Sequence, residues 1–173
     1  MNIVLLGYMG CGKSTIGNAL ASNLEIQYLD LDDYIQTKEK KIIREIFEEK
    51  GEIYFRKKEN QYLQEVLQST IDTVISLGGG TPCFAGNMEL LKNDKKSKSI
   101  YLKTSLPELV DRLFPKKDKR PLIAHLSNRD DLDDFIRKHL FERSFYYNQA
   151  ESIISTDNKT IKEIVAEIKT TLF

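Results

Sequence analysis

Short apolar runs rich in β-branched residues alternate along this chain with longer segments in which apolar residues recur at helical spacing. Alternation of this kind is typical of βαβ units built around a parallel sheet. We therefore expect one α/β domain spanning residues 1–173. The expected strands are 3–6, 26–29, 73–77, 99–102 and 152–155. The expected helices are 13–23, 42–68 with a break at Gly51, 86–92, 107–113, 132–147 and 161–172.

Length and charge exclude several classes of protein. The 173 residues suit a single compact domain. Because 26 basic residues balance 26 acidic ones, no net charge favours nucleic acid or an anionic membrane as a partner. The N-terminal apolar run stops at Gly7 and has no basic segment before it, so we expect neither a signal peptide nor a membrane span. We expect a monomeric cytoplasmic protein.

The two cysteines, Cys11 and Cys83, are too few and too far apart for a disulfide framework or a paired zinc motif, which favours a reducing compartment. Cys11 stands near Lys13 at a predicted helix N-terminus, where a reactive thiolate is favoured. The alternative is that Cys11 packs as a small residue. His125 and His139 have no acidic residues at metal-binding spacing, and we assign neither a catalytic role.

The most specific motif follows the first predicted strand. Residues 7–15 read Gly-Tyr-Met-Gly-Cys-Gly-Lys-Ser-Thr, at the spacing of a phosphate-binding loop. Glycines let backbone N–H groups converge on phosphate oxygens, the lysine reaches the β- and γ-phosphates, and the serine hydroxyl binds Mg²⁺. A merely Gly-rich turn is the alternative, and the flanking strand and helix argue against it. The residues expected to bind nucleotide in this loop are Gly10, Cys11, Gly12, Lys13, Ser14 and Thr15.

Two carboxylates follow the second predicted strand. Asp30 and Asp32 occupy positions i and i+2, so on an extended chain both would face one pocket at the carboxyl ends of the strands. Metal-dependent phosphate chemistry needs carboxylates near the phosphate loop. The alternative is that one of them only caps a helix beginning near Asp33, although Asp33 itself is the better-placed cap.

Two further features are expected at the same end of the sheet. Gly78–Gly80 directly follow a strand, and consecutive glycines allow a ligand or a neighbouring backbone to approach closely. Arg56 has Glu59 as its i+3 neighbour, which could hold the guanidinium in a fixed pose. Taken alone, Arg56 beside Lys57 and Lys58 is more typical of a solvated helix face.

The segment 114–130 differs from the rest of the chain. It contains two prolines and several lysines, and is too polar and too broken by proline for a core helix. A polar segment of this length between regular elements is typical of a flap that closes over a nucleotide. We expect a mobile lid here.

Together these features resemble the shikimate kinases, small enzymes of the nucleoside-monophosphate-kinase-like branch of P-loop proteins. The resemblance covers essentially the whole chain and lies in the order and spacing of several segments. The matching segments are 7–15, 29–32, 51–59, 76–80, 120–122 and 142–147. The resemblance implies a three-layer P-loop kinase fold with a five-stranded parallel sheet in the order 2-3-1-4-5, flanked by helices, and a mobile lid. It also implies a substrate-binding cap at about 33–60.

Shikimate kinases transfer the γ-phosphoryl group of ATP to the 3-hydroxyl of shikimate, a step toward chorismate and the aromatic amino acids. The resemblance therefore implies ATP and shikimate as substrates and Mg²⁺ as cofactor. For the nucleotide, it implies that Lys13 and the loop amides bind the phosphates, that Ser14 ligates Mg²⁺ and that Asp30 holds the metal through water. It further implies that Arg112 packs against adenine and that Arg120 reaches over the phosphates when the lid closes.

For the acceptor, the resemblance implies that Asp32 faces the substrate hydroxyl as the catalytic base. Arg56, Arg143 and Gly78–Gly80 would hold the carboxylate and ring of shikimate. A planar carboxylate suits arginine, whose rigid fork makes two parallel charge-assisted hydrogen bonds. Three apolar residues fall where the family lines its substrate cap, or form ordinary helix core; they are Ile43, Phe47 and Phe55.

Two departures from the family pattern concern the nucleotide end. Residues 157–160 read Asp-Asn-Lys-Thr where members often carry a proline beside adenine, and residues 115–119 are more basic than the usual glycine-rich lid. Two alternative functions remain. A gluconate-kinase-like enzyme would share the phosphate loop without needing a carboxylate clamp from Arg56 and Arg143. A nucleotide-binding switch would have lost catalysis and would need no acceptor pocket.

Overall fold

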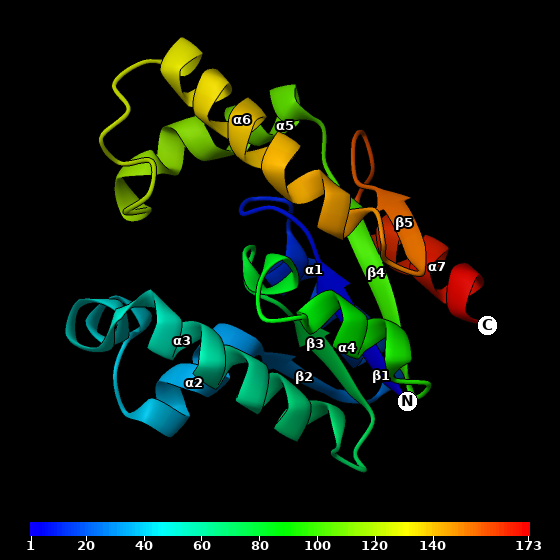
Figure 1. Ribbon diagram of the computed structural model, residues 1–173. Coiled ribbons are helices and arrows are strands. Elements are labelled where there is room, and N and C mark those ends of the chain that lie inside the picture. Colours follow the sequence, from blue (N-terminus) through cyan, green and yellow to red (C-terminus); the bar gives the residue numbers. More distant parts are fainter.

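A computed structural model describes all residues, 1–173. Its centre is a five-stranded sheet in the order β2-β3-β1-β4-β5, and every neighbouring pair is parallel (Figure 1). The number of strands and their order are as predicted. The strands are β1 (Asn2–Leu6), β2 (Gln27–Asp30), β3 (Thr73–Ser76), β4 (Ser97–Lys103) and β5 (Ser152–Ser155).

Helices cover both faces of this sheet. In Figure 1, α1 lies behind the strands and α4 lies in front of them, while α1 and α7 pack against each other. The α-helices are α1 (Lys13–Leu24), α2 (Leu31–Glu39), α3 (Ile43–Leu67), α4 (Asn87–Asn93), α5 (Leu106–Leu113), α6 (Arg129–Tyr147) and α7 (Ile161–Leu172). Two 3₁₀ helices complete the chain, η1 (Thr81–Cys83) and η2 (Phe114–Lys119). None of the helices is long and apolar enough to cross a membrane.

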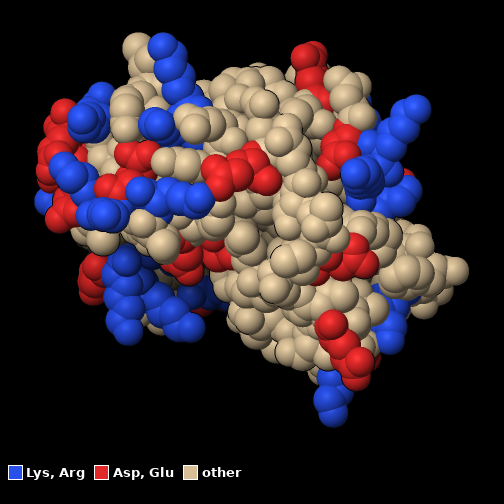
Figure 2. Space-filling model, turned by 90° about the horizontal axis from the view of Figure 1, so that it is seen from below, with Lys and Arg blue, Asp and Glu red and all other residues tan.

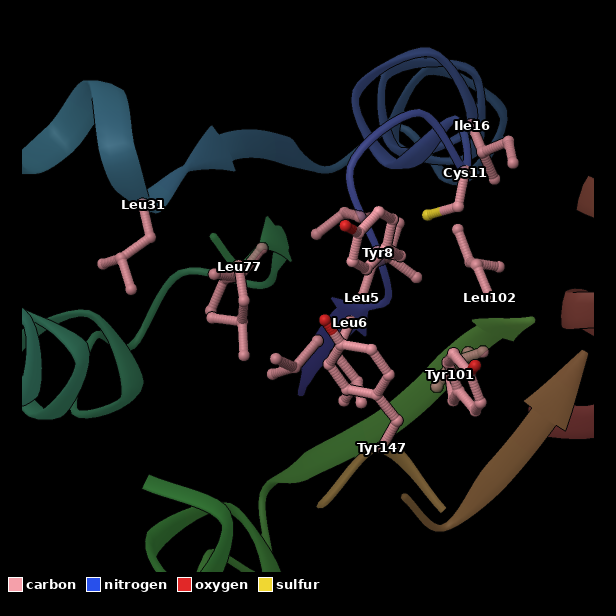
Figure 3. Close-up of a cluster of buried hydrophobic side chains, with 14 of the residues drawn as sticks. Leu5, Leu6, Tyr8, Cys11, Ile16, Leu31, Leu77, Tyr101, Leu102 and Tyr147 are labelled. Atoms are coloured by element: carbon pink, nitrogen blue, oxygen red, sulfur yellow. The ribbon is translucent and has the colours of Figure 1, made fainter. Parts of the chain in front are cut away.

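The core is centred on β1, whose four residues from Ile3 to Leu6 are completely buried. A strand with parallel neighbours on both sides and helices on both faces has no solvent side, which explains its uninterrupted apolar run. Figure 3 shows Leu5 and Leu6 among the side chains of Tyr8, Tyr101 and Tyr147. This core fixes β1, and with it the point from which the phosphate loop departs.

The helix after β2 begins earlier than expected. β2 leads into α2 at Leu31 without a loop, and the Asp30 side chain caps α2 by accepting from the N–H groups of Asp32 (3.0 Å) and Asp33 (3.4 Å). The expectation that Asp33 caps this helix is therefore wrong. Asp32 lies in the first helical turn, not on an extended strand. Aspartate is favoured both as a cap and in a first turn, where it meets the positive end of the helix dipole.

Two other boundaries bear on the site. Gly51 breaks α3 as predicted, with φ 82° and ψ 170°, a conformation that glycine adopts without strain. Helix α6 begins at Arg129, earlier than the predicted 132, because the Asn128 side chain caps it by accepting from Asp131 N–H. Residues 129–130, which we assigned to the lid, therefore belong to α6.

The balanced composition is visible on the surface. On the face shown in Figure 2, basic and acidic side chains are interspersed, with uncharged surface between them. Many of the charges form exposed ion pairs, such as Arg44 with Glu48 at 2.7 Å and Lys98 with Glu151 at 2.6 Å. Exposed pairs of this kind contribute little to stability, typically about 0–1 kcal/mol each.

Candidate active site

The phosphate loop connects β1 to α1. Its turn depends on left-handed backbone at Gly10 (φ 81°) and Gly12 (φ 98°), the residue before α1. A Cβ atom on Gly10 would lie 2.8 Å from the Leu113 side chain. The loop therefore packs tightly against α5 and directs the first N–H groups of α1 outward, which makes the helix N-terminus an anion-binding site.

Lys13 lies over this loop. Its ammonium group donates to the carbonyl oxygens of Gly7 (2.7 Å) and Tyr8 (3.1 Å). These contacts hold a half-buried positive charge at the centre of the loop. The cation is therefore in place before any phosphate arrives.

A cavity of about 680 Å³ opens above the loop. Its walls combine the loop with side chains from β2, α2, α5 and the lid segment. The predicted nucleotide residues on its lining are Gly10, Gly12, Lys13, Ser14, Thr15, Arg112 and Arg120, together with the two carboxylates Asp30 and Asp32. Positive charge, loop N–H groups and two acids around one space suit a nucleotide with a metal ion.

The two carboxylates differ in their surroundings. Burial, followed by repulsion from Asp30 and Glu59, raises the pKa of Asp32 to about 6. Burial also raises the pKa of Asp30, while its cap contacts oppose the rise. Oδ1 of Asp30 accepts both cap hydrogen bonds, and Oδ2 is left without a hydrogen-bond partner in the protein. Asp32 is thus the carboxylate more easily protonated.

A second cavity, of about 350 Å³, adjoins the first. Met9, Asp32, Gly78, Gly79 and Arg120 line both cavities, so they stand at the boundary between the two. The rest of the second lining includes Arg56 and Arg143, which were predicted to bind the acceptor, and the three apolar residues Ile43, Phe47 and Phe55, for which a substrate cap or helix core was expected. An acceptor bound here would lie directly beside the phosphate end of a nucleotide in the first cavity.

Arg56 is held rigidly in the second cavity. Its Nη1 donates to Oε2 of Glu59 at 2.8 Å, and Oε1 of Glu59 accepts from the Thr81 hydroxyl at 2.6 Å. Glu59 is 1% exposed. The guanidinium also lies 4.0 Å from the centre of the Phe84 ring. Arg56 is therefore not part of a solvated helix face, and the predicted contact with Glu59 is confirmed.

The glycine turn after β3 leaves room for three charged side chains. A Cβ on Gly78 would lie 2.8 Å from a carboxylate oxygen of Asp32. On Gly79 it would lie 2.9 Å from Nη1 of Arg143, and on Gly80 it would lie 2.9 Å from Nη2 of Arg56. A side chain at each glycine would thus displace a different charged neighbour. The two guanidinium groups converge over Gly80, and Arg143 forms no ion pair within the protein.

A cation-lined phosphate cavity and an adjoining pocket with two convergent arginines describe a kinase for a small anionic acceptor. A sequence model described as shikimate kinase matches residues 9–173. The chain belongs to the shikimate kinase family. The family assignment makes it an ATP-dependent kinase that phosphorylates an alcohol group of shikimate.

Relatives among the shikimate kinases match nearly the whole chain. The shikimate kinase of Flavobacterium johnsoniae is 52% identical over 166 residues, which are 96% of this chain and 95% of that protein. The crystal structure of shikimate kinase from Bacteroides thetaiotaomicron aligns with a TM-score of 0.90 at 37% identity, covering 99% of this chain and 98% of that one. Shikimate kinase from Acinetobacter baumannii, solved in complex with shikimate, aligns with a TM-score of 0.85 at 31% identity, covering 99% and 92%. These structures confirm the predicted fold class.

Cys11 is the one predicted nucleotide residue that lines neither cavity. Its side chain is 1% exposed and points into the core beside Leu102 and Tyr8 (Figure 3). Its sulfur lies 3.6 Å from Nζ of Lys13. The packing alternative therefore describes the thiol, and only the backbone of Cys11 remains available to a phosphate.

The sequence reasoning missed part of the shell that supports a shikimate kinase site. It gave no role to Thr81 or Phe84 and treated Glu59 only as a possible partner of Arg56. One signal was available, because Glu59 falls at helical spacing among the buried positions Phe55 and Leu63 of α3. An acid on such a face must be paired. Thr81 and Phe84 follow the glycine turn with no comparable signal.

Residues 157–160, where members of the family often carry a proline, make structural contacts at the starts of α5 and α7. Oδ1 of Asp157 accepts from the N–H of Ser105 at 3.0 Å, at the start of α5. Thr160 caps α7 in a capping box with Glu163. Arg112, predicted to pack against adenine, forms an ion pair with Glu108 at 2.9 Å and lines the nucleotide cavity.

Proposed function

We propose that this chain transfers the γ-phosphoryl group of ATP to the 3-hydroxyl of shikimate across the boundary between its two cavities. One observation carries the proposal: Asp32 and Arg120 line both cavities, so a base and a cation stand where donor and acceptor would meet. Phosphoryl transfer depends mainly on positioning and charge stabilisation, which this arrangement supplies.

In the nucleotide cavity, Lys13 and the N–H groups of residues 10–15 bind the phosphates. Mg²⁺ would be held by the Ser14 hydroxyl and, through water, by Asp30, and when bound it neutralises charge on the phosphate oxygens. The residues present suit this ion, since Mg²⁺ typically takes one or two carboxylates and otherwise phosphates and water. The free Oδ2 of Asp30 supports this assignment.

At the boundary, Asp32 orients the acceptor hydroxyl and accepts its proton. Because its pKa is raised only to about 6, the carboxylate is ionised at neutral pH and still basic enough to take a proton. Arg120 comes over the phosphates when the segment 114–128 closes. Closure of this lid excludes water, which strengthens every charge interaction in the site.

In the acceptor cavity, Arg56 and Arg143 bind the shikimate carboxylate, and Gly78–Gly80 approach the ring. The two guanidinium groups converge over Gly80, and Arg143 has no carboxylate partner of its own. A carboxylate bound between them would give Arg143 the anionic partner that it lacks, while Arg56 keeps its ion pair with Glu59. The apolar lining of Ile43, Phe47 and Phe55 suits the carbon face of a small ring.

We also propose that the protein acts in the cytoplasm as a monomer. Both cysteines are free, as expected in a reducing compartment. Sedimentation equilibrium at micromolar concentration should give a mass close to 20.0 kDa. A mass twice as large would contradict the monomer.

A single assay tests the function. ADP release is measured with Mg-ATP and, in turn, shikimate, quinate, gluconate and nucleoside monophosphates, and the phosphorylated position is read by NMR. We expect shikimate to give the highest kcat/KM, with the phosphate on the 3-hydroxyl. Faster turnover of gluconate, or ATP binding without transfer to any of these acceptors, would overturn the proposal.

A further inference from the structure

Helix α6 presents one stripe of side chains toward the site. Phe135, His139, Arg143 and Tyr147 follow one another at intervals of four residues and so lie along one side of the helix. The rings of Phe135 and His139 are 5.4 Å apart. At the other end of the stripe, the Tyr147 hydroxyl donates to the carbonyl oxygen of Gly79 at 2.6 Å. This stripe fixes α6 relative to the glycine turn.

The middle of the stripe contacts the phosphate loop through Tyr8. The Tyr8 side chain is 1% exposed, and its hydroxyl oxygen lies 2.9 Å from Nδ1 of His139. The two rings are nearly perpendicular, at 88°, with centroids 5.5 Å apart. The guanidinium carbon of Arg143 lies 5.8 Å from the centre of the Tyr8 ring. Tyr8 is thus held by His139 and supports Arg143.

Arg143 needs such support more than Arg56 does. Arg56 is tied to the buried carboxylate of Glu59 and covered by the Phe84 ring, whereas Arg143 has no carboxylate partner. A long arginine side chain loses rotamer entropy when it is fixed in one position. The face of an aromatic ring attracts a guanidinium and offers a platform that leaves its N–H groups free for a ligand.

We propose that His139 is a positioning residue: its hydrogen bond with Tyr8 fixes the ring on which Arg143 lies, and so sets the affinity for the acceptor carboxylate. The proposal rests on the role given above to Arg143. Burial and the nearby Arg143 charge lower the pKa of His139, which keeps the imidazole neutral at neutral pH. The neutral ring can accept a hydrogen bond from the Tyr8 hydroxyl at Nδ1 while Nε2 carries the ring proton.

The test uses Tyr8→Phe, His139→Leu and His139→Asn. Phenylalanine keeps the ring and removes the hydroxyl, leucine removes the acceptor, and asparagine keeps an acceptor near the position of Nδ1. A net hydrogen bond of ordinary strength corresponds to about a 5- to 10-fold effect. We expect Tyr8→Phe and His139→Leu each to raise the KM for shikimate about 5- to 10-fold, with kcat and the KM for ATP changed less than about twofold.

Further variants distinguish a positioning role of His139 from a non-specific disturbance of the structure. The double variant should be no worse than either single one, because both remove the same bond. His139→Asn should recover most of the affinity for shikimate. Phe141→Leu, at an α6 position that is 82% exposed, is the matched control and should leave all constants unchanged. Equal losses for ATP and shikimate, additive losses in the double variant, or an unchanged KM would overturn the proposal.

The hydrogen bond is also measured without catalysis. The chain has two histidines, so a His125 variant assigns the imidazole ¹⁵N signals. In the unliganded protein we expect Nδ1 of His139 to be the unprotonated acceptor, and Tyr8→Phe to shift its resonance. An Nδ1-protonated tautomer would overturn the assignment of the bond. If the proposed function itself is wrong, the wild type will not phosphorylate shikimate at all. This outcome is distinct from failure of the role proposed for His139, in which the wild type is active.

Discussion

The two cavities are built in different ways. The nucleotide cavity relies on one continuous segment, residues 7–15, in which backbone N–H groups, glycine conformations and Lys13 act together. The acceptor cavity gathers residues from the phosphate loop, α2, α3, the glycine turn, the lid segment and α6. In the proposed function, the first cavity binds phosphate through the backbone itself. In the second cavity, the position of Arg56 depends on the buried carboxylate of Glu59. Substitutions in the first cavity should therefore cause large losses of activity, and substitutions in the second should cause smaller losses that depend on the side chain introduced.

The largest effect is expected for Lys13→Ala. Lys13 is the ammonium group held over the loop by the Gly7 and Tyr8 carbonyls, so its loss removes charge stabilisation where the transition state needs it. We expect kcat to fall about 10³-fold or more, with a native circular dichroism spectrum. Retention of more than about a tenth of the wild-type turnover would contradict the assignment of the loop.

Asp32→Asn tests the boundary between the cavities. The amide keeps the shape and cannot accept the hydroxyl proton, so kcat should fall about 10²-fold or more while ATP still binds. In the wild type, kcat/KM for shikimate should fall as the pH drops through about 6, because the carboxylate becomes protonated there. A flat profile from about one pH unit below that value to about two units above it would argue against Asp32 as the base.

The same variant should be more stable than the wild type. The pKa of Asp32 is raised in the folded protein from 3.8 to about 6, so ionisation above this range disfavours folding. Removing the charge should therefore increase the free energy of unfolding by about 1–3 kcal/mol at pH 7. The gain should disappear as the pH falls below about 4, where both states are protonated. Urea unfolding at several pH values measures this difference in the free energy of unfolding. A variant less stable than the wild type at pH 7 would contradict the prediction.

Arg143→Lys and Arg56→Lys compare the two arginines of the acceptor cavity. Lysine keeps the charge and loses the paired fork, which should cost about 1.5–3 kcal/mol, or roughly 10- to 150-fold in kcat/KM for shikimate. ATP binding should barely change. Arg56→Lys should also lower the melting temperature, because Arg56 pairs with the buried Glu59 and Arg143 does not pair. Unchanged shikimate kinetics in both variants would mean that neither arginine binds the carboxylate. Equal melting temperatures would mean that the ion pair between Arg56 and Glu59 adds no stability.

The smallest effect is expected for the Cys11 thiol. Since its side chain is 1% exposed, alkylation of the native protein should be slower at Cys11 than at the half-buried Cys83, with or without ATP. Peptide mapping after timed labelling measures both rates. Fast labelling of Cys11 that ATP suppresses would restore the reactive-thiol hypothesis and place the sulfur in the nucleotide cavity.

The sequence was most informative where function and local structure depend on the same residues. Residues 7–15 predict a strand, a turn and a helix as well as a ligand, and the sheet order followed from the family resemblance that this motif anchored. The cap of α2 could not be placed, because Asp30, Asp32 and Asp33 are all suitable caps and only packing chooses Asp30.

The supporting shell of the acceptor cavity was harder to predict. Arg56, Arg143 and Asp32 were named, but the contacts that hold them join residues far apart along the chain. Thr81 reaches Glu59 across 22 positions, and Tyr8 reaches His139 across 131. Hydrophobic periodicity assigns residues to a buried face, yet it carries no information on which distant polar group will meet them.

The glycine turn after β3 has a consequence for how this enzyme can change. The space that side chains would occupy at Gly78, Gly79 and Gly80 is already filled by Asp32, Arg143 and Arg56. A side chain added at any of the three positions would therefore displace the carboxylate or the guanidinium group that now occupies that space. Ile43 and Phe47 form apolar lining of the same cavity, and substitutions there would reshape it without placing a new side chain at the glycine turn.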